Sequence, residues 1–514
     1  MDMLAEDEVI IVGAGPGGLC LAGELALADI RCTVLEKRTE RTGESRALAL
    51  QARTLEMLGL RGLAKPFLEQ GNPVDHFRVT VGSARIDLDV LDTDYQQVNI
   101  CAQRVIEHVL ETRALENGAR IERGVEVLGV SNDGAGAVVR VRDDKGTREL
   151  RAAWVVGCDG TNSVTRESVG IKFPNRQYPY HVVFADAKLH NEPEHGVYMH
   201  VSNAGLGVGF NFGDGYWRIG SLERLPLKAP GRVPLEEVAE ALRRVFGRDV
   251  GPHDPRWTSR AIFRLGHALT YRMGRVLVLG DAAHVQSPVG GQGLNLALQD
   301  AMNLGWKLAS VMKGEALENL LDTYEPERRS VATKVMRGTD IGTRVLLSGL
   351  PPVRVMRRIM IPFVLSLPPV HAKMAGLVSG LEFSYPKPSA PRPSADREGP
   401  KSLTGARVPN MQLTDQLTGE AYTLYDLFRA GKFVLIDQGD GLLSKRCAGW
   451  EDRVVTVRAT ISDRRELSRY AGLLCRPDGY YAWSGDNDAD ALREDLTFWC
   501  GSPRKIQPHA DMTA

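Results

Sequence analysis

The chain has 514 residues, of which 43% are apolar and 25% charged, and its 64 basic side chains balance 64 acidic ones. These values exclude a chain that is disordered throughout, and the zero net charge argues against a broad nucleic-acid surface. At roughly 100–200 residues per domain, the length suggests about three to five domain-sized units. Seven cysteines without a CxxC pair do not form a disulfide framework, so we expect a reduced, cytoplasmic chain.

The first predicted elements are a strand, a glycine-rich turn, a helix and a second strand. Residues 9–12 (VIIV) form a continuous apolar run, which is typical of a strand buried on both faces. Residues 19–28 place apolar side chains on one helical face, and residues 31–35 form the next strand, which ends at Glu36. This order predicts a β-α-β unit with a right-handed crossover.

The turn has the pattern Gly13-x-Gly15-x-x-Gly18, and a physical role can be given for a glycine at each of the three positions. Gly13 permits a tight turn, Gly15 lets the backbone approach a pyrophosphate, and Gly18 allows close packing of helix on strand. The helix N-terminus favours an anion. Glu36 stands where an acid binds ribose hydroxyls. The pattern therefore indicates a dinucleotide with a free 2′-hydroxyl, FAD or NAD rather than NADP.

The middle of the chain is rich in predicted strands. Residues 77–99 alternate apolar and polar side chains, which predicts an antiparallel strand pair. Residues 178–270 contain mostly strand patterns, with one helical window at 235–246. Within this region, residues 207–212 and 216–219 fit the two arms of a hairpin.

Two further predicted strands each lead into a polar loop. One ends in Asp159-Gly160, a pair that is also common in turns without a function. The other ends in Gly280-Asp281 and continues through residues 288–295 (PVGGQGLN) into a long helix. A carboxylate at a strand end can accept hydrogen bonds from polyol hydroxyls, and a helix N-terminus can hold an anion or an electron-rich carbonyl. One dinucleotide with two ends would explain both anchors.

The last third of the chain holds a linker and a further domain. Residues 385–401 contain five prolines among serine, lysine and arginine, which predicts a semi-rigid linker. Beyond it, strand patterns at 433–436 and 454–457 indicate a small α/β domain.

The strongest apolar segment is 359–370 (IMIPFVLSLPPV). It is too short to span about 30 Å of hydrocarbon and is broken by prolines. We expect a buried helical segment. Contact with a membrane surface is the alternative, favoured by Arg354, Arg357 and Arg358 just before it.

Together the three motifs resemble the class A FAD-dependent aromatic hydroxylases, which are flavoprotein monooxygenases. The resemblance covers nearly the whole chain and is closer to the polyketide hydroxylases of angucycline and anthracycline tailoring. Rifamycin-modifying monooxygenases and some ring-opening oxygenases share the pattern. The closer resemblance rests on residues 41–47 (RTGESRA), 52–56 (ARTLE), 290–295 (GGQGLN), 299–307 (QDAMNLGWK) and 474–479 (LCRPDG).

The resemblance implies an α/β fold with three parts. A Rossmann-like FAD-binding domain would carry an inserted, mostly antiparallel β-sheet that binds substrate, and a thioredoxin-like α/β domain would follow. We expect the FAD-binding domain in 1–177 and 271–384, with 77–99 joining the sheet of the substrate domain at 178–270. The linker would be 385–401 and the thioredoxin-like domain 402–514. Its Cys447 and Cys475 are far apart in sequence, so we expect no dithiol chemistry.

The resemblance also implies a set of FAD contacts. In the family the equivalent of Asp281 lies on the ribityl chain, and the loop 288–295 lies beside the isoalloxazine ring. A proline usually precedes the family's FAD-contacting glutamine, whereas Ala102 stands there here, which could alter the local turn. The expected cofactor-binding residues are Gly13, Gly15, Gly18, Glu36, Lys37, Arg46, Gln103, Asp159, Gly160, Asp281, Pro288, Gly291, Gly293, Leu294 and Asn295.

By the same resemblance, NADPH or NADH reduces the flavin, O₂ forms a C4a-hydroperoxide, and its distal oxygen attacks an electron-rich phenol carbon. The catalytic candidates are Arg46, Pro288 and Gly290; a solvated surface arginine is the alternative for Arg46. His284 could act as a base, but in this family that histidine is mostly structural. With one GxGxxG unit only, the nicotinamide would visit transiently. We expect no metal, because no cluster of ligands at metal-binding spacing occurs.

The expected substrate is a polycyclic aromatic polyketide, as in antibiotic biosynthesis. Phe210 and Phe212 share one face of a strand and, with Trp217, could line its cavity, although an ordinary core explains them equally well. Two alternatives remain: Baeyer–Villiger or ring-opening oxygenation, including antibiotic inactivation, and a non-catalytic protein that binds flavin or an intermediate. We expect no nucleic-acid partner, no stable membrane insertion, and a monomer or homodimer.

Overall fold

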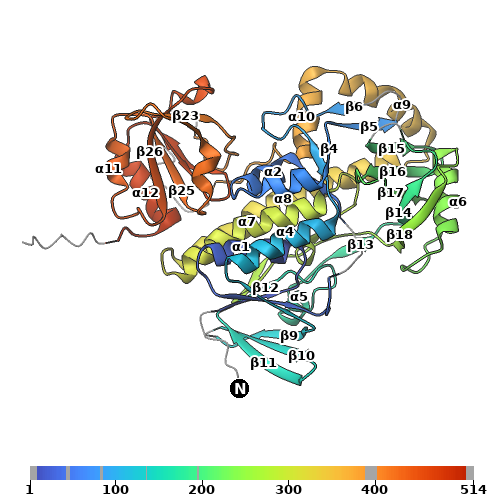
Figure 1. Ribbon diagram of the computed structural model, residues 1–514, viewed down its shortest axis with the longest axis horizontal. Helices are drawn as coiled ribbons and strands as arrows, with labels where there is room; N and C mark the ends of the chain where they lie inside the picture. Colours follow the sequence, from blue (N-terminus) through green and yellow to red (C-terminus); the bar gives the residue numbers. More distant parts are fainter. Residues whose placement is uncertain are drawn as a thin grey trace, which may run out of the picture. The chain divides into compact units, whose positions relative to one another are not determined.

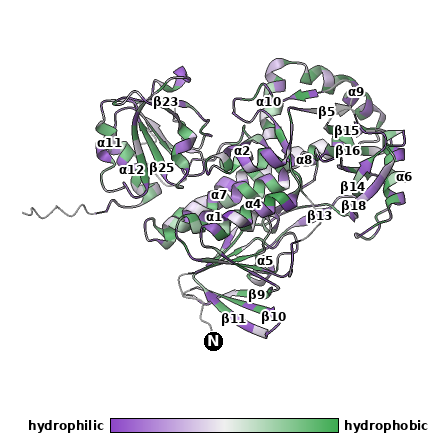
Figure 2. Ribbon diagram, in the orientation of Figure 1, coloured by the Kyte–Doolittle hydropathy of each residue, from purple (hydrophilic) through white to green (hydrophobic). Residues whose placement is uncertain are grey.

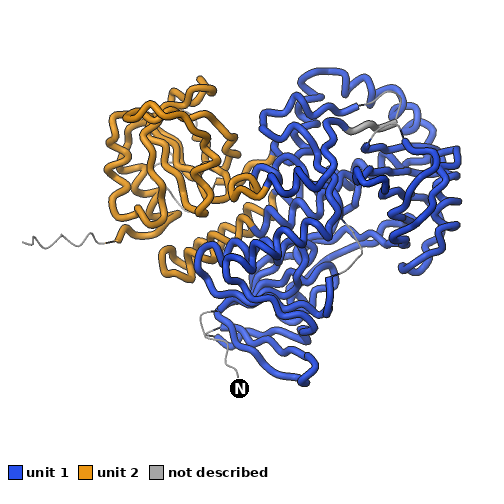
Figure 3. Tube along the Cα trace, in the orientation of Figure 1, with its two compact units in different colours: residues 1–56, 64–301, 331–382 blue, residues 57–63, 302–330, 383–514 orange. Residues whose placement is uncertain are grey.

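The computed structural model describes residues 8–41, 47–80, 85–134, 136–193, 196–387 and 402–504 (Figure 1). It divides into two compact units, each assembled from separated segments (Figure 3). Unit 1 comprises residues 1–56, 64–301 and 331–382, and unit 2 comprises residues 57–63, 302–330 and 383–514. Chain length suggests about three to five units. The structure has fewer, because segments that are far apart in the sequence fold together into one unit.

Unit 1 contains the predicted β-α-β unit. Strand β1 (Val9–Val12) pairs in parallel with β2 (Cys32–Glu36) and with β12 (Trp154–Gly157), and every residue of β1 is buried. Helix α1 (Pro16–Leu27) connects β1 to β2 and packs beside α4 (Gln103–Glu116) (Figure 1). The sheet has the order β20-β21-β12-β1-β2-β8, completed by β20 (Arg272–Met273), β21 (Val276–Val278) and β8 (Arg120–Arg123). The carboxyl ends of its parallel strands therefore meet at one edge.

A seven-stranded sheet is the second large sheet of unit 1. The predicted hairpin is present as β16 (Gly205–Asn211) and β17 (Trp217–Glu223). Helix α6 (Leu235–Phe246) covers one face and ends at Gly247, whose φ of 68° suits a glycine C-cap. The order is β18-β14-β17-β16-β15-β5-β6, with β18 (Pro252–Ala261), β14 (His181–Leu189), β15 (Val197–Val201), β5 (His76–Thr80) and β6 (Arg85–Asp87).

Three small sheets and several helices complete this part of the chain. Apolar and polar residues alternate along α4 and α7, as expected for helices that pack on one side (Figure 2). The small sheets are β9 (Glu126–Asn132) with β10 (Ala137–Asp143) and β11 (Gly146–Ala152), β3 (Ala49–Leu50) with β7 (Val98–Ile100) and β4 (Asn72–Val74), and β13 (Asn175–Gln177) with β19 (Arg264–His267) and β22 (His284–Val285). The helices are α2 (Ala52–Gly59), α3 (Ala64–Gln70), α5 (Val164–Ser168), α7 (Gln292–Met312), α8 (Tyr324–Leu346), α9 (Pro351–Leu365) and α10 (Pro368–Ser379).

Two sequence predictions differ from this architecture. The strand pair expected over 77–99 is shorter, since β5 and β6 pair but β7 belongs to another sheet. The expectation that 359–370 is buried is wrong, because Ile359 is 65% and Phe363 64% exposed. Helix α9 ends before Pro368, which starts α10 at its first turn. Among the described residues no single helix is long and apolar enough to cross a bilayer, and α9 with α10 passes that test only as a pair bent by 100°.

Unit 2 is built on a six-stranded sheet with apolar cores on both faces. Alternate residues of β25 (Phe433–Asp437) point to the two cores, Val434 and Ile436 to one, Phe433 and Leu435 to the other. The order is β24-β23-β26-β25-β27-β28, with β24 (Ala421–Thr423), β23 (Gln412–Asp415), β26 (Val454–Ile461), β27 (Gly472–Cys475) and β28 (Tyr481–Gly485), together with α11 (Leu442–Arg446) and α12 (Ala489–Cys500).

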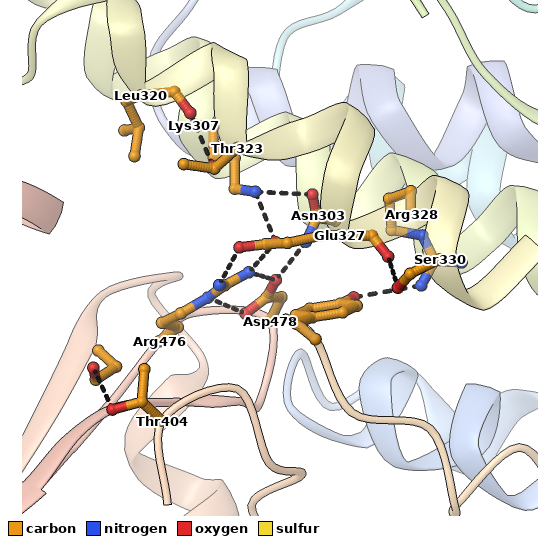
Figure 4. A network of polar contacts seen from close by, with 12 residues as sticks. Asn303, Lys307, Leu320, Thr323, Glu327, Arg328, Ser330, Thr404, Arg476 and Asp478 are labelled. Carbon is orange, nitrogen blue, oxygen red and sulfur yellow. Dashed lines mark hydrogen bonds and ion pairs between the residues drawn. The ribbon is translucent and has the colours of Figure 1, made fainter. Parts of the chain in front are cut away.

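A buried ion network joins the separated segments of unit 2 (Figure 4). The Glu327 carboxylate accepts hydrogen bonds from Arg476 Nη1 at 2.7 Å, Arg476 Nη2 at 2.8 Å and Lys307 Nζ at 2.7 Å. Arg476 Nε also donates to Asp478 Oδ1 at 3.0 Å, and Asn303 Nδ2 donates to both carboxylates. The two cations and two anions balance, as burial of charge requires.

The two ends of this network titrate differently. Burial lowers the pKa of Lys307 to about 8, and the neighbouring charge of Arg476 also lowers it, against the attraction of Glu327. Burial would raise the pKa of Glu327, but Arg476 and Lys307 outweigh it and lower the pKa to about 2. Both residues therefore carry their charge at neutral pH.

Candidate cofactor and reaction site

The turn between β1 and α1 has the geometry that its glycines predict. Gly13 has a φ of 104°, and a Cβ there would lie 2.7 Å from the Cys158 carbonyl oxygen. A Cβ on Gly18 would clash with the Gly13 carbonyl oxygen, so helix and strand pack closely. Gly15 is different: its φ is −77°, and a Cβ there would meet no atom within 4 Å. No protein atom therefore covers the backbone at Gly15, the glycine that is expected to approach a pyrophosphate.

Glu36 lies beside this turn at the carboxyl end of β2. Its side chain is buried, and its Oε2 accepts a hydrogen bond from the Ala14 backbone N–H at 2.9 Å. Its Oε1 accepts one from the Arg38 backbone N–H at 3.0 Å. These bonds fix the carboxylate next to the glycine turn while each oxygen keeps further acceptor capacity. The neighbouring Lys37 is exposed.

Asp281 stands at the end of β21 and faces the start of α7. A Cβ on Gly293, in the first turn of α7, would lie 3.9 Å from Asp281 Oδ1. Buried Gln286 also faces Gly293, and its Oε1 has no hydrogen-bond partner among the described residues. A buried orphan acceptor beside a carboxylate and a helix N-terminus is the kind of place where a polar ligand group belongs.

The first and third motifs meet although they are far apart in sequence. A Cβ on Gly17 would lie 2.9 Å from Leu279 Cδ1 and 3.3 Å from Ala297 Cβ. Gly280, with a φ of 59°, approaches the same Ala297. Helix α7 therefore packs against both glycine turns, so the open Gly15, the acid Glu36 and the acid Asp281 belong to one edge of the sheet. These residues fit an extended dinucleotide such as FAD, with an acceptor for its ribose and a second for its sugar chain.

Asp159 and Gly160 serve local structure in the described chain. Asp159 Oδ2 accepts hydrogen bonds from the Thr165 backbone N–H at 2.9 Å and from Thr165 Oγ1 at 3.0 Å, which holds the start of α5. Gly160 takes a φ of 81°. Buried Arg166 Nη1 donates to the Ala282 carbonyl oxygen at 3.0 Å. The second motif thus braces the loop that carries Asp281.

His284 is fully buried and holds the same loop. Its Nε2 lies 2.7 Å from Asp300 Oδ2, which also accepts a hydrogen bond from the Gly280 backbone N–H at 3.0 Å. Tyr271 and His267 pack against its ring. This placement fits the structural alternative for His284 and not that of a base in contact with substrate.

The loop from Pro288 to Asn295 is fixed by side-chain amides. The Pro288 carbonyl accepts a hydrogen bond from the Gly291 N–H at 3.0 Å, and Gly290 and Gly291 take φ values of 92° and 62°. Asn295 Nδ2 donates to the carbonyls of Gly291 at 2.8 Å and Ala49 at 2.9 Å. Its side chain is therefore committed to the protein, while Pro288, Gly290 and Gly291 remain partly or fully exposed, and Leu294 is buried.

Gln51 also belongs to this site, and no sequence motif indicated it. Its Nε2 donates to the Gly290 carbonyl at 2.6 Å, its Oε1 accepts from Gln292 Nε2 at 3.2 Å, and its backbone N–H donates to Asn295 Oδ1 at 2.9 Å. Gln292 also donates to the Val378 carbonyl in α10 at 2.8 Å. The one signal in the sequence was a polar residue, Gln51, between two apolar segments, which are β3 and the start of α2 in the structure.

Of the two remaining predicted cofactor residues, the structure describes Gln103. Gln103 starts α4, accepts a hydrogen bond from the Ala47 backbone N–H at 2.8 Å, and donates to Glu107 Oε1 at 2.7 Å. Ala102 has a φ of −60°, the value that a proline would impose, so the turn is retained without the family's proline. Arg46 lies outside the described residues.

The three predicted substrate residues do not lie together. Phe210 and Phe212 are half-buried and pack with residues of α10 and of the strand before Gln51. Phe210 and Val289 of the glycine loop also pack against one common apolar cluster. Trp217 is opposite Asn211 in the hairpin register and points to the other face, where it is buried under α6. Grouping Trp217 with the two phenylalanines is therefore wrong, because successive strand residues alternate between faces.

Comparison with known proteins adds to this geometry. Residues 6–339 match the family model of the FAD binding domain, and residues 401–503 match that of the aromatic-ring hydroxylase C-terminal domain. A relative from Streptomyces rimosus, a 12-dehydrotetracycline 5-monooxygenase/anhydrotetracycline 6-monooxygenase, is 36% identical over 96% of this chain and 99% of its own. The rifampicin monooxygenase of Streptomyces venezuelae is 36% identical over the same shares. A solved aromatic hydroxylase from angucycline biosynthesis superposes with a TM-score of 0.85 at 34% identity, over 97% of this chain and all of its own.

Proposed function

Because the chain belongs to the FAD-dependent aromatic-ring hydroxylases, we propose that it uses NAD(P)H and O₂ to hydroxylate a polycyclic aromatic polyketide. The observation that carries the proposal is the convergence of the open Gly15 turn, Glu36 and Asp281 on one sheet edge, in a chain whose relatives include monooxygenases that act on tetracycline and rifampicin compounds. When bound, the flavin supplies the redox and oxygen-transfer chemistry.

The chain's own residues would bind and orient the cofactor. The turn of Gly13, Gly15 and Gly18 would receive the pyrophosphate, Glu36 the ribose, and Asp281 the sugar chain that leads to the flavin ring. The exposed backbone of Gly290 and Gly291, with Pro288, would face the ring from a loop that side-chain amides hold still. A fixed loop orients the reacting partners and excludes water, which is the protein's share of such a reaction.

The face of the seven-stranded sheet that bears Phe210 would bind the substrate. Phe210, Phe184, Phe263 and Val289 of the glycine loop all pack against one buried apolar cluster, which would provide an apolar aromatic wall near the loop. A flat polycyclic phenol buries much apolar surface against such a wall. Arg46 would act near the flavin and the nicotinamide.

The last domain would have a thioredoxin-like fold in a supporting role. Its six-stranded sheet contains a parallel pair, β25 with β26, and antiparallel neighbours. Cys475 lies in one apolar core and Cys447 in the other, and burial raises the pKa of both thiols, that of Cys447 to about 11. Thiols on opposite faces of a sheet favour packing rather than dithiol exchange.

Oxygen insertion next to a ketone, or ring opening, is the second candidate reaction. The observation behind its antibiotic-inactivation variant is a relative named rifampicin monooxygenase, whose name gives an antibiotic as its substrate. Mass analysis of the products separates the reactions: hydroxylation adds one oxygen and retains every ring, whereas the alternative gives a lactone or a cleaved ring.

The first experiment is the visible spectrum of the purified protein, followed by anaerobic mixing with NADPH or NADH and a panel of polycyclic phenols. We expect a flavin spectrum that bleaches quickly with one aromatic class only. Absence of flavin after reconstitution would contradict the cofactor assignment. Flavin that neither nicotinamide reduces with any aromatic compound would favour the non-catalytic binding protein.

A further inference from the structure

Helix α9 presents an uncovered apolar surface. Among the described residues, eighteen large apolar side chains are exposed, and seven of them lie in the short span 350–367. Their three- and four-residue spacing places those on α9 along one side of the helix. Figure 2 shows that α9 also carries polar residues. The α9 face consists of Leu350, Val355, Met356, Ile359, Met360, Phe363 and Leu367.

The opposite side of α9 holds the helix to unit 1. Buried Arg357 donates to the carbonyls of Val345 at 3.3 Å and Leu346, and Arg354 Nη1 donates to Asn203 Oδ1 at 2.9 Å. Leu365 packs into the apolar cluster around Ala375 of α10. The helix is therefore anchored, and its exposed face is a fixed feature rather than an unpacked segment.

The chain segment that bears this face carries charged side chains of one sign. Residues 341–381 contain Arg344, Arg354, Arg357, Arg358 and Lys373 and no aspartate or glutamate. Arg358 is exposed and directly precedes Ile359 and Met360 of the α9 face. A second copy of the chain, docked about a two-fold axis, would bring this cationic region against itself. An anionic surface complements it instead.

We propose that the α9 face docks on an anionic lipid surface. An anchored helix with a bulky apolar side and arginines along its margin lies in the plane of the headgroups, with its apolar side chains among the acyl chains. Phe363, Ile359 and Met360 would enter the bilayer surface, and Arg358 would contact lipid phosphates. The attachment would be peripheral and reversible. It does not depend on the proposed reaction.

The test is co-sedimentation of the full chain with vesicles of phosphatidylcholine, with and without phosphatidylglycerol. We expect binding to the anionic vesicles that weakens with salt, and about fivefold weaker binding for Arg358→Glu. The double variant Ile359→Ser/Phe363→Ser should bind at least about tenfold more weakly. The double variant Leu317→Ser/Leu417→Ser removes two leucines that are 76% and 77% exposed outside the face, and it should bind like the unaltered chain.

Three results would overturn the proposal. The first is no binding to anionic vesicles, or equal binding to vesicles of phosphatidylcholine alone. The second is a stable dimer in sedimentation velocity that Ile359→Ser/Phe363→Ser dissociates, since a second copy would then cover the face. The third is a loss of turnover by that variant in vesicle-free buffer, since the face would then cover the substrate. Retained turnover with lost vesicle binding supports the proposal.

Discussion

Gly15 allows cofactor binding to be separated from folding. Its φ is open to any residue, and a Cβ there would meet no protein atom. Gly15→Val should therefore fold normally and yet lose FAD, because its side chain fills the space proposed for the pyrophosphate. Bound flavin is measured from the visible spectrum and folding by circular dichroism. Gly338→Val, also open and without a positive φ, is the matched control and should stay yellow.

Asp281 is the second anchor that can be tested alone. Asp281→Ala removes the acceptor at the α7 end of the site and should weaken FAD binding by at least about tenfold, the cost of a hydrogen bond to a charged group. Titration of the flavin-free protein with FAD, followed by flavin fluorescence, gives the affinity. An unchanged affinity would remove Asp281 from the cofactor site.

Arg46 is proposed to act on the reaction and not on cofactor affinity. Arg46→Ala should keep FAD bound and slow flavin reduction by NAD(P)H by about tenfold or more, because a cation near the flavin stabilises developing negative charge. Anaerobic stopped-flow measurement of the flavin absorbance gives the rate. If the rate is unchanged, the surface-arginine alternative holds.

Gln51 is predicted to position the loop beside the flavin. Gln51→Ala removes its bonds to the Gly290 carbonyl and to Gln292, so the loop should loosen while FAD stays bound. We expect several-fold more hydrogen peroxide per NAD(P)H consumed, because a looser site protects the reaction less well from water. Gln96→Ala is the control, since Gln96 also donates to two carbonyls, those of Asp89 and Leu91, but is exposed. Equal peroxide release from both variants would contradict the positioning role.

At the scale of elements, the buried ion network links the separated segments of unit 2 and should stabilise the unit. Glu327→Gln leaves the buried Arg476 and Lys307 with too few anions, so it should cost about 3–5 kcal/mol of unfolding free energy. Denaturant unfolding at pH 7, followed by the tryptophan fluorescence of unit 2, measures the loss. A cost below about 1 kcal/mol would show that the network does not stabilise the unit.

The same network gives a pH dependence with a defined sign. The pKa of Glu327 is about 2 when folded and near its ordinary value of 4.5 when unfolded. The unfolded chain therefore binds more protons between these values, so its contribution is full above pH 4.5 and is lost as the pH falls toward 2, by about 3 kcal/mol. Glu327→Gln should lack this part of the acid dependence, and identical slopes in both proteins would contradict the assignment.

Sequence patterns predicted some elements closely and missed others for physical reasons. The window 235–246 is helix α6 with the same bounds, because its apolar face and the glycine after it are both local signals. The apolar segment 359–370 was a harder case. Hydropathy reports what a side chain prefers but not which element covers it, so α9 has an exposed face.

The site shows the same division. The geometry of the glycine turns could be predicted, because it depends on the local backbone alone, whereas the role of their acids in binding a cofactor stays a prediction. Local sequence could not predict the roles of Gln51, Asp300 and Gln292. Their hydrogen-bond partners lie more than 10 residues away in the chain or in another motif. The segments 299–307 and 474–479, which resemble polyketide hydroxylases, supply Asn303, Lys307, Arg476 and Asp478 to the ion network of unit 2. Asp300, in the first of these segments, instead holds Gly280 and His284.

At the scale of the whole molecule, the C-terminal domain should be required for the stability of unit 2. Ending the chain after residue 387 removes Arg476 and Asp478, which leaves the Lys307–Glu327 pair without the rest of its network and uncovers Trp306 and Leu320. A shortened chain should therefore melt about 10 °C lower or aggregate on expression, because apolar surface that the sheet covers becomes exposed to water. Ending the chain after residue 504 keeps every described residue of unit 2 and should leave the melting temperature unchanged. Differential scanning calorimetry of both chains measures this, and a chain ending at 387 that melts like the full protein would show that the helical segment 302–330 is stable without the sheet it packs on.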